Sequence, residues 1–263
     1  MINRIRTIID KEWAEVFKNR IVLFTVLIMP LIFTVLPLVI LYSTHTAGGG
    51  SSDSTDVPAM FAQACGNVSG MDCVQIYIVN EFLILFMIMP VAIPVAIAAY
   101  SIVGEKTTRS LEPLLATPVT TEELLAGKSL AAALPAILAT WGCFALFLLL
   151  SPLTGISAGV QHYLLGPTWL LAVILLGPLM AIMAVIFAVI VSSRVNDPRA
   201  AEQISMVVIV PVLGVMFAQL GGLLVVNVPL VLISAVVLAA IDAVLIYFGA
   251  RMFQRETILT QWR

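Results

Sequence analysis

The sequence predicts an all-α, polytopic membrane protein with six transmembrane helices, and three observations support this fold class. Hydrophobic residues make up 61% and charged residues 11% of 263 residues, against about 45–50% and about 25% in soluble domains. The apolar sequence falls into six stretches of about 20 residues, which as helices cross ~30 Å of hydrocarbon. All 13 Lys and Arg residues lie before Ile21, between Gly104 and Lys128, between Arg194 and Arg199, or from Arg251 onward.

This charge pattern predicts the sidedness of the protein. Basic residues near span ends are retained in the cytoplasm. The alternate segments 44–77, 152–163 and 225–229 contain no Lys or Arg, and we expect them to be external. Both termini are therefore predicted to be cytoplasmic, in a plasma or inner membrane. No basic run is long enough to indicate nucleic acid as a partner.

Residues 1–20 predict an amphipathic helix before the first span. Its apolar residues recur at helical spacing, whereas five charged residues point in other directions: Arg6, Asp10, Lys11, Glu15 and Lys18. Such a helix is suited to lie among the lipid headgroups of the interface. The alternative is a charged tail that only orients the first span. The apolar stretch 21–43 is too long for a signal-peptide core of about 7–15 residues.

We place the six spans at 21–43, 79–103, 129–151, 165–191, 202–224 and 230–250. Helices are required because open strand edges leave backbone groups unpaired in lipid. The fifth span is interrupted by Pro211, Gly214, Gly221 and Gly222. A helix broken near its outer end, followed by a short re-entrant turn, fits this stretch as well as one straight rod.

The first external loop carries Cys65 and Cys73, and the Asn67-Val68-Ser69 triplet. The two cysteines either form a disulfide on an oxidising face or remain free thiols. The triplet matches a glycosylation sequon, and whether it is used stays open. Asn80 and Glu81 follow at the outer end of the second span, where we expect them to reach water.

The segment 104–128, between the second and third spans, is polar, then amphipathic, then broken by Pro118. Thr120 and Glu123 have the spacing of a capping box, so two short helices are predicted. Leu111, Leu114 and Leu115 share one face of the first. We interpret the segment as a cytoplasmic protrusion whose exposed charges dock onto a soluble partner. The alternative is a solvated connecting loop.

This segment resembles the one between the second and third spans of type-2 ABC exporter permeases. Their pattern is an acidic-basic start, Thr-Leu-Glu-x-Leu-Leu-x-Thr-Pro-Val, an acidic pair, Leu-Leu and Gly-Lys. Residues 109–119 read RSLEPLLATPV and residues 122–128 read EELLAGK. Ser110 replaces the usual Thr, and Pro113 is a variation. Residues 192–203 and Lys11-Glu12-Trp13 resemble the family's loop between spans four and five and the start of its N-terminal elbow helix.

The resemblance implies a transmembrane subunit of an ATP-driven exporter, paired with a second copy of the permease and two cytosolic ATPase subunits. Residues 1–20 would form the elbow helix and 104–128 the coupling helices, both resting on the ATPases. The implied ATPase-coupling residues are Glu105, Lys106, Arg109, Glu112, Leu114, Leu115, Glu122, Glu123 and Lys128. Arg194, Asp197 and Arg199 would form a second cytoplasmic contact, and 214–229 the re-entrant helices near the external gate.

The chain has no Gly-x-x-x-x-Gly-Lys-[Ser/Thr] phosphate loop, so Mg-ATP is expected on the partner ATPase. We expect no catalytic residue and no cofactor or metal site in this chain. Its other partners would be membrane lipids. The mostly apolar spans predict an amphiphilic or lipid-like cargo, moving along spans one, two and five.

Three polar residues are candidates for the pathway or gate: Gln219, Asn227 and Asp242. The first two flank the expected outer gate. Asp242 is the one acid well inside a span, where a charge costs about 2.5–3.5 kcal/mol on insertion scales. It is either protonated or held by donors from a neighbouring helix.

Two other functions fit the same spans. One is an ion-coupled transporter that acts without an ATPase, which would move cargo as a purified chain. The other is the membrane component of a system for metalloenzyme or cofactor maturation, which the absence of a stable ATPase complex would favour.

Overall fold

The computed structural model describes residues 2–16, 18, 20–46, 58, 61, 65, 70–107 and 121–252, and within them it is helical without a strand. Six helical stretches are long and apolar enough to cross a membrane: Val22–Thr44, Met71–Ser101, Glu123–Thr154, Ala158–Arg194, Pro198–Leu220 and Val228–Gly249. The all-α class and the six candidate spans are therefore confirmed, and the chain is a multi-pass membrane protein.

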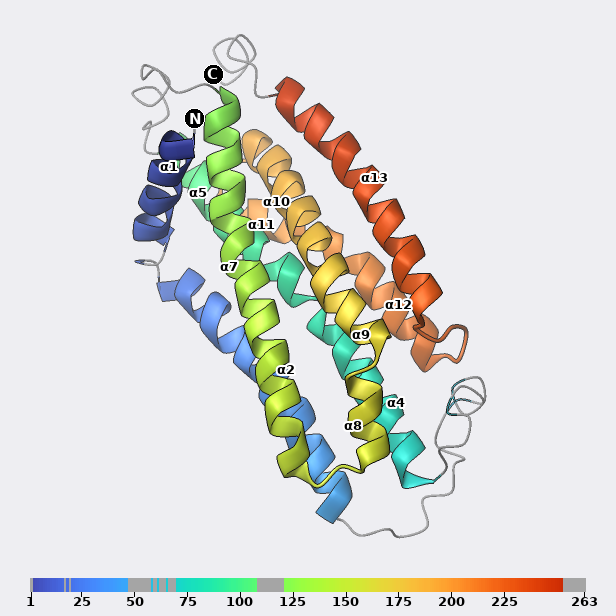
Figure 1. Cartoon of the computed structure of the whole chain (residues 1–263). Helices are drawn as coiled ribbons and strands as arrows, with labels where there is room; N and C mark the ends of the chain where they lie inside the picture. The colour runs from blue at the N-terminus through green and yellow to red at the C-terminus, as the bar shows by residue number, and fades with distance from the viewer. Residues whose placement is uncertain are drawn as a thin grey trace.

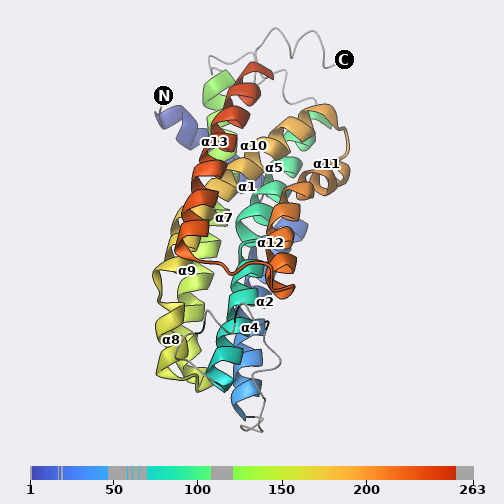
Figure 2. The same cartoon turned by 90° about the vertical axis from the view of Figure 1, so that its right-hand side faces the viewer.

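The helices form an elongated bundle (Figures 1 and 2). Helix α1 (Ile2–Val16) and the last turn of α13 (Val228–Met252) lie at the same end. Arg194 and Arg251 lie at the last turns of their helices there, and we call it the basic end. The opposite end carries the disulfide described below, and we call it the disulfide end. An even number of spans returns the chain to the end from which it started.

The second span lies at the centre of the bundle and is almost wholly enclosed by the other helices. It consists of α4 (Met71–Phe86) and α5 (Met89–Thr107), separated by a turn at Met87 and Ile88. Pro90 follows the turn and has no N–H to donate to the Phe86 carbonyl, which favours an interruption at this point. Around α5 pack α7 (Thr121–Leu150) and α10 (Gly177–Arg194). Buried alanines on α7 and α10 let the helices approach closely.

The fourth span differs from the single rod expected at 165–191. After η2 (Ser151–Thr154), it begins with α8 (Ala158–Leu164) and continues through α9 (Pro167–Leu171) and a π-helical turn, η3 (Ala172–Leu176), into α10. In the π-helical register the Val173 carbonyl would pair with residue 178, which is a proline and has no N–H. The Trp141 indole of α7 donates to this carbonyl instead, at 3.1 Å.

The fifth span is helical from Pro198 to Leu220, through α11 (Pro198–Ser205), η4 (Met206–Ile209) and α12 (Val210–Leu220). It ends in a glycine cap. Gly222 has φ +67°, and the Leu223 N–H donates to the Ala218 carbonyl at 2.8 Å. The break at the outer end is present. The re-entrant helices expected across 214–229 are absent, because α12 runs through Gly214 and 221–227 is not helical.

The first span, α2 (Arg20–Thr46), follows α1. Half-buried and buried residues of α1, among them Trp13 and Val16, face the bundle, so part of its apolar face packs within the chain. Its position at a membrane interface stays a prediction. Residues 108–120 lie outside the described residues, and so do the expected first coupling helix and Thr120 of the expected capping box.

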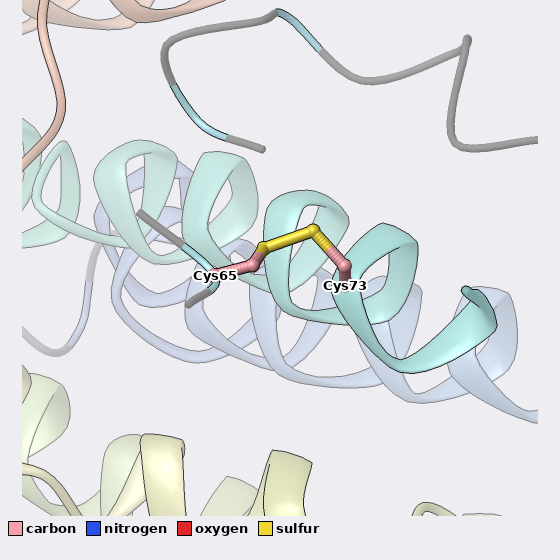
Figure 3. Close-up of a disulfide and its surroundings, with 2 residues drawn as sticks. All are labelled: Cys65 and Cys73. Carbon is pink, nitrogen blue, oxygen red and sulfur yellow. A yellow bond between two sulfur atoms is a disulfide. The ribbon is translucent and has the colours of Figure 1, made fainter. Parts of the chain in front are cut away.

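Cys65 and Cys73 form a disulfide, with their Cα atoms 5.9 Å apart (Figure 3). Of the two alternatives left open by the sequence, the structure has the bonded one. Cys73 lies in the first turn of α4 and is buried. The Phe61 ring is 3% exposed and packs edge-on against Tyr77, with ring centroids 5.1 Å apart. The bond therefore links the connection between the first two spans to the start of the second span.

We predict that Cys65→Ser with Cys73→Ser lowers the free energy of unfolding by about 2–3 kcal/mol, because a loop of this length loses its closure constraint. Unfolding in mixed detergent and dodecyl sulfate micelles measures the change. Cys143→Ser, which alters the free cysteine, is the matched control. Equal stability of the double variant and the wild-type protein would contradict the prediction.

Candidate functional site

A buried ion pair joins three helices near the basic end. The Lys128 ammonium of α7 donates to Glu12 Oε1 of α1 at 2.7 Å and to Ser101 Oγ of α5 at 2.9 Å. The Ser101 hydroxyl in turn donates to Glu12 Oε2 at 2.5 Å. Glu12 is 3% exposed and Lys128 8% exposed. We call these three residues the tie.

The position of Glu12 on α1 explains why it is buried. It falls one helical turn after Ile8 and one before Val16, on the apolar face of the helix. A carboxylate buried there needs a cation and further donors to offset its desolvation. Lys128 and Ser101 supply both, so each oxygen of Glu12 accepts a hydrogen bond.

Close packing brings α1 onto α7 beside the tie. A Cβ atom added to Gly127 would lie 2.8 Å from Ile8 Cγ2, so a larger residue at this position would push α1 away. The Trp13 indole donates to the Ala131 carbonyl at 2.9 Å. That carbonyl has no intrahelical N–H donor, because residue 135, four positions on, is a proline. Two motifs far apart in sequence, Lys11-Glu12-Trp13 and Gly127-Lys128, therefore contact each other.

Glu123 and Lys128 differ from their expected placement as exposed docking charges. Both are 8% exposed, and both are paired with residues of α1, Glu123 with Arg4 at 3.5 Å. Their charges are used within the chain because α1 covers the start of α7. Both are less exposed than expected, and their part in docking onto a partner stays a prediction.

The other predicted coupling residues lie at the ends of that segment or within it. Glu105 and Lys106 are in the last turn of α5, and Glu122 is in the first turn of α7, with side chains outside the described part of the chain. The structure places the two helix ends that bound 108–120, and α5 and α7 pack against each other. Four predicted residues lie wholly outside the described residues: Arg109, Glu112, Leu114 and Leu115.

The predicted second contact lies next to the end of α5. Arg194 ends α10, and Asp197 caps α11 by accepting the Arg199 N–H at 2.9 Å. All three side chains are exposed. Ala201 of α11 packs against Ala99 and Val103 of α5, so the contact and the tie share this helix.

The three gate candidates do not form one group. Gln219 is 1% exposed in the last turn of α12 and bonds the backbone N–H of Val226 at 3.2 Å. Asn227 caps α13 by accepting the Leu230 N–H at 3.0 Å. Asp242 lies on the same helix, roughly 22 Å from Asn227 by helical rise. It is 4% exposed, and neither of its oxygens has a hydrogen-bond partner among the described residues.

Asn80 and Glu81, expected to reach water, are instead bonded inside the bundle. Asn80 is fully buried and accepts a hydrogen bond from the Tyr163 hydroxyl at 2.9 Å. Glu81 Oε1 accepts one from Gln219 Nε2 at 3.0 Å. Their signal in the sequence was their position within an apolar stretch. Among the described residues no group of three or more His, Cys, Asp or Glu side chains could hold a metal ion.

We predict that Lys128→Met destabilises the protein by about 3–5 kcal/mol, because it leaves the Glu12 carboxylate buried without a cation. Adding Glu12→Gln removes that charge and should recover much of the loss. Lys18→Met, at an exposed lysine beyond the end of α1, should change stability by less than about 0.5 kcal/mol. Unfolding in mixed micelles measures all four proteins. A double variant no more stable than Lys128→Met alone would contradict the assignment.

A family model described as ABC-2 family transporter protein matches residues 6–228. This range includes α1 from residue 6 onward, the tie, both predicted contacts and the turn after α12. No curated protein matches the chain. Membrane subunits of this kind are generally not catalytic themselves, and they typically work with ABC ATPase partners. The chain belongs to the ABC-2 family of transporter permeases.

Proposed function

We propose that this permease is the membrane subunit of an ATP-driven exporter, and that cytosolic ATPase subunits dock at its basic end. The observation that carries the proposal is the tie, which fixes α1, the end of α5 and the start of α7 to one another. These helix ends bound residues 108–120, the proposed coupling segment. A segment anchored on both sides can pass a force on to the helices that hold it.

The second span is the route by which this force would reach the rest of the domain. It is enclosed by the bundle over most of its length and runs from the tie to the disulfide end. Packed interiors are poorly compressible and therefore transmit displacement. A movement of the coupling segment would shift α5 together with α1 and α7, and through α4 it would reach the opposite end.

Exposed apolar faces support a second copy of the permease as a partner. Helix α2 exposes Phe24, Leu27, Leu31 and Val35 in a row at helical spacing. Helix α12 exposes Val210 and other apolar side chains in the same way. A second copy would cover part of these faces and lipid the remainder.

Cargo passing between two such surfaces would be amphiphilic or lipid-like. Mg-ATP would be bound and hydrolysed on the two ATPase subunits.

The orientation follows from the charges of the basic end. Both the start of α1 and the end of α13 lie there, with Arg194 and Arg251. We place this end in the cytoplasm of a plasma or inner membrane, because basic residues near span ends are retained inside. The disulfide end would then be external, where an oxidising environment preserves the Cys65–Cys73 bond.

We predict that Glu105→Lys with Glu112→Lys weakens capture of the ATPase at least about tenfold, because like charges would meet across the contact. Co-purification of tagged ATPase with the permease from membranes measures the effect. The reversal of Glu123 is left out, since its pairing with Arg4 means that it would test the packing of α1 instead.

Arg251→Glu is the matched control, because it reverses a charge at the same end but on α13, outside the proposed contact. It should leave ATPase capture within about twofold of wild type. Unchanged co-purification with Glu105 and Glu112 both reversed would contradict docking through this segment.

A further inference from the structure

One buried amide near the disulfide end holds three parts of the chain together. Gln219, in the last turn of α12, donates through Nε2 to Glu81 Oε1 of α4 at 3.0 Å. Its Oε1 accepts the backbone N–H of Val226 at 3.2 Å. Helix α4, helix α12 and the turn 221–227 are therefore joined through a side chain that is 1% exposed.

The turn held by Gln219 is the connection between spans five and six. It begins at the glycine cap of α12, where Gly222 has φ +67°, and ends at Asn227, which caps α13. Between these caps the backbone is not helical. The hydrogen bond from Val226 to Gln219 restrains its path, together with the packing of Val225 and Val226 against the bundle. Loss of that bond would loosen the turn at Val226 while leaving both helix caps in place.

Only one of the two carboxylate oxygens of Glu81 accepts a hydrogen bond from the described residues. Its Oε2 atom is shielded from solvent and has no hydrogen-bond partner among the described residues. An acceptor left in this way forfeits the hydration that it would have in water. The bond to Gln219 stabilises the contact of α12 and the turn 221–227 with α4. The missing hydrogen bond at Oε2 destabilises the same contact. Water that reached Oε2 would restore this hydration, which lowers the free energy needed to break the contact.

Glu81 and the tie lie on the same span. Ser101 is near the basic end of α5, and Glu81 is on α4, beyond the turn at Met87 and Ile88. A change in the direction of α5 at the tie can move α4 about this turn. The acceptor of the Gln219 bond is thus on the element that we propose to receive the force.

We infer that Glu81, Gln219 and the Val226 backbone form an outer latch, which closes the release side of the permease and breaks when cargo leaves. The part played in release rests on the proposed function. The restraint that the latch places on 221–227 does not depend on the proposed function. The restraint and the part played in release are tested separately.

Hydrogen exchange of the purified full chain tests the restraint. Glu81→Leu and Gln219→Leu each remove one half of the Glu81–Gln219 bond, and exchange in 221–227 should become about tenfold faster in both. The paired exchange Glu81→Gln with Gln219→Glu restores a donor opposite an acceptor and should return the rate to within about threefold of wild type. Gln161→Leu on α8 makes the same chemical change outside the latch and should have no effect on this turn.

Unchanged exchange in both single variants, or a paired variant as fast as the singles, would overturn the latch. A general loss of stability is recognised separately, because it would also speed exchange in α1 and α7 near the tie. The expected change is confined to the disulfide end.

ATP hydrolysis by the permease–ATPase complex in liposomes tests the part played in release. Each single variant should raise hydrolysis without added cargo several-fold, since the release side no longer needs to be opened, and the paired variant should restore the wild-type rate. Wild-type hydrolysis in all variants would overturn the role in release. Failure of any ATPase to bind would instead contradict the proposed function, and the exchange experiment would still decide the latch.

Discussion

The arrangement of the basic end depends on the buried pair of Glu12 and Lys128. Removing two charges from water costs several kcal/mol for each ion, and their attraction offsets this only when the remaining hydrogen-bonding groups are satisfied. Ser101 meets this condition by donating to one and accepting from the other. Three helices must therefore be in register before the pair is stable. The pair therefore fixes the position of α1 along α5 and α7. Apolar contacts alone would specify this position less sharply.

Backbone groups freed by prolines add to this specificity. Pro135 leaves the Ala131 carbonyl without its usual donor, and the Trp13 indole of α1 supplies one. Pro178 and the π-helical turn do the same for Val173, and Trp141 supplies the donor. In a membrane domain such carbonyls cannot rely on water. Each tryptophan therefore fixes the position of one helix along another.

The composition and the length of the apolar stretches were sufficient to predict the fold class, because a chain crosses lipid mainly as helices of about 20 apolar residues. They could not show that Lys128 is internal, since its partner is on a helix more than a hundred residues away. Glu12 did carry a signal, a charge on the apolar face of an amphipathic helix. Glu81 and Gln219 carried one too, as polar residues inside apolar stretches. The pairing of such residues depends on which helices touch, and the order of residues in the sequence does not contain it.

The central claim is that α1, the end of α5 and the start of α7 move as one body when the ATPase acts. Asp10 of α1 and Ala126 of α7 are both exposed. Spin labels at these two positions allow the distance between the helices to be measured by pulsed electron paramagnetic resonance. The permease–ATPase complex would be measured without nucleotide and with ATP trapped. We predict the same distance distribution in both states, because the buried tie remains intact. A distance that changes with ATP would show α1 separating from α7, and it would contradict the account.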